Sequence, residues 1–258
     1  MTNKLRFVSL QSGSNGNCLF VESHGVRLLF DAGLTGLQTQ LRLAEIGVDP
    51  ATVQGLVISH AHSDHISGAG VLHRQFGIPV WMTHGTFIQA KERKKLGRIS
   101  EPNLFSAGTT LRFGSITVET IQTTHDAPDA VCFIVDNGTV RLGIMTDMGC
   151  RFLGLKEAIA TLDGILLESN YDPDMLESGF YSAELKQRIR SGSGHLSNIE
   201  AAELLHDAGK KLRWACLGHL SADNNRPEIA VATHRKILGG NLPLYAASRH
   251  EVSIVPEL

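Results

Sequence analysis

The feature that most constrains this chain is the stretch SHAHSDH at residues 59–65. It carries three imidazoles and one carboxylate: His60, His62, Asp64 and His65. An apolar run at residues 55–58 comes directly before it and is typical of a buried strand. Neutral imidazoles and carboxylates are ligands of divalent metals such as zinc, and a buried strand is rigid enough to aim them. The stretch therefore predicts a metal site at the end of a strand.

Strand-like and helix-like patterns alternate along the rest of the chain. Strands are expected at residues 5–10, 18–22, 26–30, 78–82, 110–113, 116–120, 132–136, 140–145, 164–168, 212–217 and 252–255. Helices are expected at residues 37–46, 70–76, 86–96, 153–162, 182–190, 198–208 and 228–238. Asn137 and Gly138 separate two strands and predict a type I′ hairpin turn. No linker or low-complexity run divides the sequence, so residues 1–258 are expected to form one domain of helix-covered sheet.

Three further candidate ligands stand just beyond other predicted strands. They are His125, Asp147 and His219. One tetrahedral metal takes about four ligands, so the enlarged set is too big for one ion and fits two. We expect one ion on His60, His62 and His125 and the other on Asp64, His65 and His219. Asp147 can bridge them, because each oxygen of a carboxylate can face one cation.

Asp31 and His195 are polar residues whose roles the sequence leaves open. Asp31 closes a predicted strand, where it can either cap a helix or orient a metal-binding histidine. His195 follows a Gly/Ser loop at residues 191–194, and no ligand position is left for it. Its expected role is therefore that of a general acid that protonates a leaving group, and the alternative is a neighbour of a helix cap.

The composition limits the partners. The net charge of −2 provides no global field for polyanions, so any contact with nucleic acid needs a local patch or metal ions. The four cysteines form no CxxC pair and are expected to be reduced: Cys18, Cys132, Cys150 and Cys216. No signal-peptide pattern and no apolar run of membrane length is present, so we expect a cytoplasmic protein without a membrane partner. The sequence leaves the oligomeric state open.

These residues resemble the metallo-β-lactamase superfamily. The HxHxDH signature lies at residues 60–65, and His125, Asp147 and His219 match the remaining motifs in order. The resemblance implies an α+β fold, a four-layer αββα sandwich with two metals at the sheet edge. The chain is also similar to the YycJ/WalJ branch of the superfamily, through residues 13–17, 168–172, 181–198, 219–221 and 224–225. That branch implies phosphodiester hydrolysis, notably 5′-to-3′ exonuclease activity on DNA. His195 resembles the extra active-site histidine of ribonuclease Z-like relatives.

Some residues of this sequence differ from the motifs of other branches of the superfamily, which makes those branches poorer matches. Asp147 is not the cysteine of a common zinc β-lactamase pattern, and His62 is not the glutamate of the iron flavoprotein pattern. About 70 residues separate Asp147 from His219, too few for the large insertion of ribonuclease J-type nucleases. No counterpart of the tRNA-gripping arm of ribonuclease Z is evident. These departures argue against specialisation for structured RNA.

The sequence therefore predicts a dinuclear metal-dependent phosphodiesterase that acts on nucleic acid, with single-stranded DNA or DNA ends as the substrate. Asp64 and His195 are the expected catalytic residues, and two divalent ions, zinc or manganese with iron also compatible, are the expected cofactors. Candidate phosphate contacts, which could equally be surface charges and loop caps, are Lys186, Arg188, Arg190, Ser221 and Asn225.

Two other functions are open to such a chain. The first is hydrolysis of a small ester or thioester, as in glyoxalase II-like or lactonase-like relatives; the weak net charge favours it, but the run around His195 does not. The second is a metal-stabilised binding or regulatory module. Intact Asp64 and Asp147 oppose the second, because a structural site closes with four ligands and needs no second metal.

Overall fold

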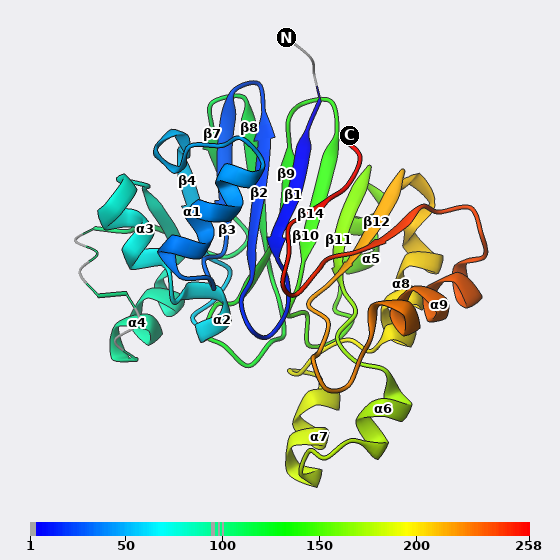
Figure 1. The fold of residues 1–258 in the computed structure, drawn as a ribbon. Coiled ribbons are helices and arrows are strands. Elements are labelled where there is room, and N and C mark those ends of the chain that lie inside the picture. Colours follow the sequence, from blue (N-terminus) through cyan, green and yellow to red (C-terminus); the bar gives the residue numbers. More distant parts are fainter. Residues whose placement is uncertain (1–3, 94–95, 98, 100) are drawn as a thin grey trace.

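The computed structural model describes residues 4–93, 96–97, 99 and 101–258. Two seven-stranded mixed sheets pack face to face, and helices cover the outer side of each (Figure 1). The strand orders are β14-β1-β2-β3-β4-β5-β6 and β13-β12-β11-β10-β9-β8-β7. This arrangement confirms the predicted α+β fold of four αββα layers.

The first sheet begins as an antiparallel meander and continues with parallel strands. Its strands are β1 (Arg6–Gln11), β2 (Cys18–Ser23), β3 (Val26–Phe30), β4 (Gly55–Val57), β5 (Val80–Thr83), β6 (Asn103–Phe105) and β14 (Ser253–Ile254). Its helices are α1 (Gly36–Glu45), α2 (Ser63–Ile66), α3 (Ala69–Phe76) and α4 (His84–Glu92), with a 3-10 turn at Pro50–Thr52. The predicted helix at 86–96 thus ends earlier, and residues 94–95 of that prediction lie outside the described part of the chain.

The second sheet repeats this plan, antiparallel from β7 to β10 and parallel from β10 to β13. Its strands are β7 (Thr110–Phe113), β8 (Ile116–Gln122), β9 (Val131–Asp136), β10 (Arg141–Met145), β11 (Gly164–Glu168), β12 (Trp214–Gly218) and β13 (Leu244–Ala246). Its helices are α5 (Leu155–Ala160), α6 (Pro173–Ser178), α7 (Ala183–Arg190), α8 (Asn198–Ala208) and α9 (Pro227–Leu238), with a 3-10 turn at Gly209–Lys211. Figure 1 shows α6 and α7 projecting below the sheets.

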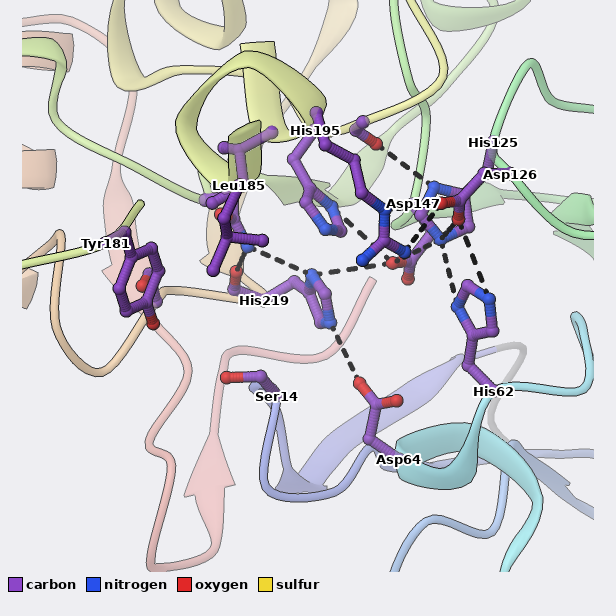
Figure 2. A pocket seen from close by; sticks show the side chains of 15 residues that line it. Ser14, His62, Asp64, His125, Asp126, Asp147, Tyr181, Leu185, His195 and His219 are labelled. Atoms are coloured by element: carbon purple, nitrogen blue, oxygen red, sulfur yellow. Dashed lines mark hydrogen bonds and ion pairs between the residues drawn. The ribbon is translucent and has the colours of Figure 1, made fainter. Parts of the chain in front are cut away.

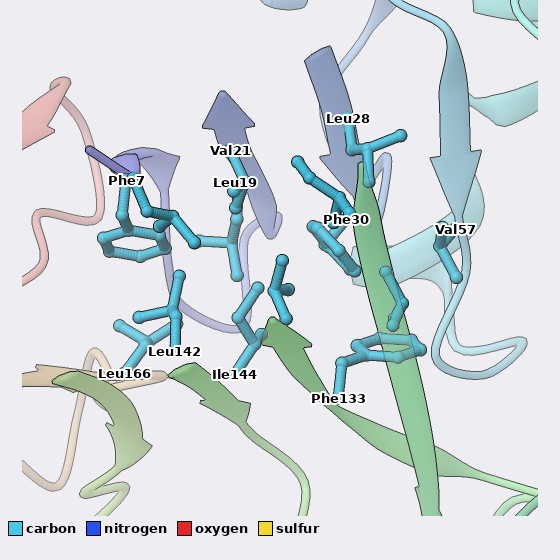
Figure 3. Packing of buried hydrophobic residues seen from close by; sticks show 14 of the residues in the cluster. Phe7, Leu19, Val21, Leu28, Phe30, Val57, Phe133, Leu142, Ile144 and Leu166 are labelled. Carbon is cyan, nitrogen blue, oxygen red and sulfur yellow. The ribbon is translucent and has the colours of Figure 1, made fainter. Parts of the chain in front are cut away.

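The main hydrophobic core lies between the two sheets (Figure 3). Phe30 of the first sheet meets Phe133 of the second with ring centroids 5.1 Å apart, and Phe7 stacks on Trp214 at 5.9 Å. Two further apolar clusters join each sheet to its outer helices. Strands buried on both faces explain the continuous apolar runs of the sequence. This packing fixes the strand ends on which the site is built.

The structure corrects several local predictions. The short elements α2, α6, β6 and β13 were not predicted, because segments this short carry too few periods of a pattern. The predicted type I′ turn is wrong: Gly138 has a φ of +84°, but Asn137 does not have the positive φ that such a turn requires. Instead, the Asn137 side chain accepts hydrogen bonds from the backbone N–H groups of Thr139 and Val140 and closes a longer loop.

Two expectations from composition can be compared with the structure. All four cysteines are free, as predicted. Burial raises the pKa of the Cys132 and Cys216 thiols to about 12, which keeps them protonated and unreactive. None of the described helices is both long enough and apolar enough to span a membrane.

Candidate metal centre

The candidate ligands lie just beyond strand ends at one edge of the two sheets. His60 follows β4, His125 follows β8, and Asp147 and His219 follow β10 and β12. Because β10, β11 and β12 are parallel neighbours, their carboxyl ends lie side by side. Residues far apart in the sequence therefore meet at one place.

Two of these candidate ligands, and Asp31 beside them, have an unusual backbone conformation. Asp31, Asp147 and His219 have φ values of +60°, +55° and +53°, in the left-handed region. A positive φ is uncommon for residues other than glycine, although aspartate and histidine adopt it more often than most, and such strain is typical of functional sites. A glycine allows close packing beside these residues. A Cβ on Gly33 would lie 1.7 Å from the carbonyl oxygen of Asp64. The loops after β3 and β4 thus approach as closely as only glycine allows.

The structure brings the seven predicted ligands together in overlapping groups. His60, His62 and His125 form one group and Asp64, His65 and His219 another, each with ligand atoms within 4.8 Å of one another. In the first group, His62 Nδ1 and His125 Nε2 are 3.2 Å apart. In the second, Asp64 Oδ2 lies 3.5 Å from both His65 Nε2 and His219 Nε2. Figure 2 shows most of these side chains converging on one cavity.

Asp147 lies between the two groups. Its Oδ1 is 3.5 Å from His125 Nε2, and its Oδ2 is 3.2 Å from His65 Nε2. Oδ1 also lies 3.7 Å from His219 Nδ1, so the carboxylate contacts residues of both groups. This is the placement that a bridging carboxylate needs.

The donor atoms fit divalent metal ions. His60 is buried, and its Nδ1 contacts the Ser59 hydroxyl at 2.9 Å, while its Nε2 has no hydrogen-bond partner. An unpaired buried nitrogen is costly, and a cation at this point would satisfy it. Burial lowers the pKa of His60, and it lowers that of His62 to about 4. Both imidazoles are therefore neutral at pH 7, the form that binds a metal.

Charges on the other ligands also favour a cation. Burial raises the pKa of Asp147, but the nearby His219 and His65 outweigh burial and hold it well below its usual range. Burial lowers the pKa of His65 and His219, yet Asp147 and the neighbouring carboxylates raise both overall. The same carboxylates would attract a metal cation, which then competes with the proton.

Asp31 orients His65. Its Oδ2 accepts a hydrogen bond from His65 Nδ1 at 2.7 Å, and its Oδ1 accepts one from the Ser59 backbone N–H at 2.8 Å. Holding Nδ1 in this way leaves His65 Nε2 turned toward Asp64 and Asp147. Of the two roles considered for Asp31, the structure shows the one beside a histidine.

Glu168 is a buried carboxylate whose role the sequence did not reveal. Its Oε1 accepts a hydrogen bond from His195 Nδ1 at 2.7 Å and lies 3.2 Å from His219 Nδ1. Its Oε2 accepts the backbone N–H groups of Met148 and Leu196. Burial raises its pKa, but the contacts with His195 and His219 lower it to about 2, so it is ionised. The only sequence signal was an acidic residue that ends the apolar run of β11.

His195 lies beside the centre rather than in either predicted ligand group. Its ring centroid is 5.2 Å from that of His125 and 5.3 Å from that of His219. Its Nδ1 is held by Glu168, and the residue lines the cavity. With Nδ1 occupied, Nε2 is the nitrogen left for a substrate. Asp147, Glu168, His195 and His219 also form a compact group of possible ligand atoms, which makes metal binding the alternative role of His195.

Asp126, which was not predicted, connects the centre to Arg188. Its Oδ1 is 3.6 Å from His62 Nε2 and 3.5 Å from His125 Nε2. Its Oδ2 accepts hydrogen bonds from Arg188 Nη2 and Nε at 2.6 and 2.8 Å. Arg188 on α7 is thereby held at the rim of the cavity.

Only some of the candidate phosphate contacts line the cavity, which has a volume of about 250 Å³. Arg188 and Ser221 line it. Lys186 and Arg190 do not, and both are bound to Glu177 on α6. Asn225 is buried, and its amide donates hydrogen bonds to backbone carbonyls at 2.8 and 3.1 Å. The structure thus leaves Arg188 and Ser221 as the predicted contacts that reach the cavity.

Comparison with solved structures supports the fold. The structure superposes on the metallo-beta-lactamase fold protein YhfI of Bacillus subtilis with a TM-score of 0.76. The alignment has 17% sequence identity and covers 98% of this chain and 100% of that one. At this level of identity, the similarity concerns the fold alone.

Sequence comparison identifies the family. Residues 12–143 match the Metallo-beta-lactamase superfamily. The chain is 38% identical over 233 residues to the exodeoxyribonuclease WalJ of Streptococcus pneumoniae, covering 88% of this chain and 86% of that protein. It is 35% identical over 237 residues to the exodeoxyribonuclease YycJ of Bacillus anthracis, covering 91% and 89%. The chain therefore belongs to the metallo-β-lactamase superfamily and, within it, to the family of the WalJ and YycJ proteins.

Proposed function

We propose that this protein is a dinuclear metal-dependent phosphodiesterase that removes nucleotides from DNA in the 5′-to-3′ direction. The observation that carries the proposal is the pair of ligand groups on either side of Asp147, with His195 beside them on the same cavity. The names of the WalJ and YycJ relatives, both exodeoxyribonucleases, support the choice of DNA as the substrate.

The proposed centre holds two divalent ions. His60, His62 and His125 would bind one ion, and Asp64, His65 and His219 the other, with Asp147 between them. Zinc and manganese suit this set of nitrogen and oxygen ligands, and iron is also compatible. When bound, two such ions supply neutralisation of phosphate charge and activation of a water molecule.

Protein side chains would complete the reaction. Asp64 has a side chain that is 23% exposed and lines the cavity, so its carboxylate can also accept a hydrogen bond from the attacking water. His195 would protonate the leaving oxygen through Nε2. Glu168 fixes the ring of His195 through its contact with Nδ1, which leaves Nε2 directed to the substrate. Arg188 would contact a phosphate of the substrate once its bond to Asp126 is exchanged.

A comparison of substrates tests the proposal. Purified protein with Mn²⁺ or Zn²⁺ would be incubated with 5′-labelled single-stranded DNA, bis-p-nitrophenyl phosphate or a glutathione thioester. We expect the label to appear first in a mononucleotide, with slower cleavage of the small phosphodiester. A 3′-labelled strand should shorten stepwise and release its label last. Turnover of the thioester alone would refute the nuclease assignment.

A further inference from the structure

One wall of the cavity is apolar and comes from a single segment. Tyr181, Leu185 and Ile189 all line the cavity and lie four residues apart. Residues at this spacing share one face of a helix, and Leu185 and Ile189 belong to α7. Figure 2 shows Tyr181 and Leu185 across the cavity from His62 and His125. We call these three residues the α7 wall.

The α7 wall is not part of the hydrophobic core. No residue of helix α7 is fully buried, and Tyr181, Leu185 and Ile189 are half-buried. Within the described part of the chain, the wall residues belong to none of the clusters of buried hydrophobic side chains. Leaving apolar surface exposed to water is unfavourable. A ligand that covers the wall would therefore gain binding energy that the fold itself does not use.

Specific contacts hold the α7 wall in position relative to the metal centre. At one end, the Tyr181 hydroxyl donates a hydrogen bond to Asp223 at 2.7 Å. At the other end, the carbonyl oxygen of Ile189 accepts the backbone N–H of His195 at 3.0 Å. A Cβ on Gly194 would lie 2.2 Å from that oxygen, so only glycine allows the chain to turn so tightly. The wall and His195 are thus parts of one fixed unit.

We propose that the α7 wall receives the base and sugar of the substrate's 5′-terminal nucleotide; this inference rests on the proposed exonuclease function. Every nucleobase has an apolar π face, so an aromatic and aliphatic surface can hold any base without reading the sequence. The wall lines the same cavity as the metal ligands, so a base held on it lies beside the phosphate that would be cleaved.

The inference can be tested by removing the terminal base from the substrate and, separately, by truncating side chains of the α7 wall. Three 5′-phosphorylated single strands would be compared: an unmodified strand, one with an abasic 5′-terminal residue, and one with an abasic 3′-terminal residue. The protein variants are Tyr181→Ala, Tyr181→Phe and Leu185→Ala. Gln187→Ala is the matched control, because Gln187 lies on the same helix but does not line the cavity. The metal content of each variant would be measured, and only samples with the wild-type metal content would be compared.

We expect the wild type to cleave the 5′-abasic strand about tenfold more slowly in kcat/KM than the unmodified strand, as loss of one stacked base predicts. The 3′-abasic strand should behave like the unmodified one. Tyr181→Ala and Leu185→Ala should slow the unmodified strand but change the 5′-abasic strand little, because removing partners of one contact is not additive. Tyr181→Phe should retain the discrimination, and Gln187→Ala should match the wild type.

Several results would overturn the inference. Equal rates on unmodified and 5′-abasic strands, with DNA cleavage intact, would refute binding of the terminal base by the α7 wall but leave the proposed function standing. Equal losses for Tyr181→Phe and Tyr181→Ala would show that the bond to Asp223, rather than the ring, is what matters. A wild-type protein that cleaves no DNA would refute the proposed function and this inference with it.

A second readout does not depend on turnover. A strand that carries 5-iodouracil as its 5′-terminal base should photocrosslink to Tyr181, identified by mass spectrometry of the digested protein. The same strand with the iodinated base in its interior should give little of this product. A crosslink confined to residues outside the cavity would contradict the proposed position of the base.

Discussion

Asp64→Asn is expected to lower kcat on single-stranded DNA by about 10³-fold, within the range for loss of a group that moves or orients a proton. The substitution preserves shape but removes the negative charge that lies 3.5 Å from both His65 Nε2 and His219 Nε2. Burial raises the pKa of Asp64, but His65 and His219 outweigh it and keep this carboxyl ionised. An amide can neither accept the water's proton nor balance a second cation.

The measurement is kcat with metal content determined on the same samples. Asp207→Asn is the matched control, since Asp207 is an exposed aspartate that pairs with Lys156 away from the cavity. We expect the control to keep full activity and the Asp64 variant to lose one ion, activity or both. Activity within roughly threefold of the wild type, at unchanged metal content, would remove Asp64 from the mechanism.

His195→Ala is expected to lower kcat on DNA by about 10²- to 10³-fold while both ions stay bound. The loss should depend on the leaving group, because an alkoxide needs a proton to depart and p-nitrophenolate does not. On bis-p-nitrophenyl phosphate the same variant should lose no more than about threefold. Parallel assays on both substrates, with metal analysis, provide the measurement.

Controls separate a general acid from a ligand or a structural residue. His206→Ala removes an exposed histidine of α8 and should change neither substrate. Glu168→Gln, which alters the residue that positions His195 at 2.7 Å, should weaken DNA cleavage more than cleavage of the activated ester. Loss of one ion in His195→Ala would instead make His195 a metal ligand. Equal losses on both substrates would argue against proton donation.

The sequence predicted the parts of the site that depend on local pattern. His60 to His65 are adjacent in the chain, and Asp147 and His219 stand where apolar strands end. The strands themselves were predictable, because they are long apolar runs buried on both faces. Grouping these residues rested on their shared place at strand ends and on the number of ligands that two metals need. Parallel neighbours explain only why Asp147 and His219 meet, since His60 follows β4 in the other sheet.

What the sequence could not show depends on packing across the molecule. Glu168 is one acidic residue among many until β10, β11 and β12 place it against His195 and His219. The orientation of α7 was similarly hidden. In the sequence, only its Lys and Arg residues were candidates, as phosphate contacts. In the structure, Leu185 and Ile189 also line the cavity, and the carbonyl oxygen of Ile189 accepts the N–H of His195. No local pattern in an exposed, largely charged helix fixes this rotation.

The number of metal ions that activity requires tests the account most directly. Protein stripped of metal with a chelator would be titrated with Mn²⁺ or Zn²⁺, following bound metal and DNA cleavage in the same samples. The account predicts two ions per chain, with full activity only when both groups around Asp147 are filled. Full activity at one ion per chain, or DNA cleavage by the metal-free protein, would contradict it.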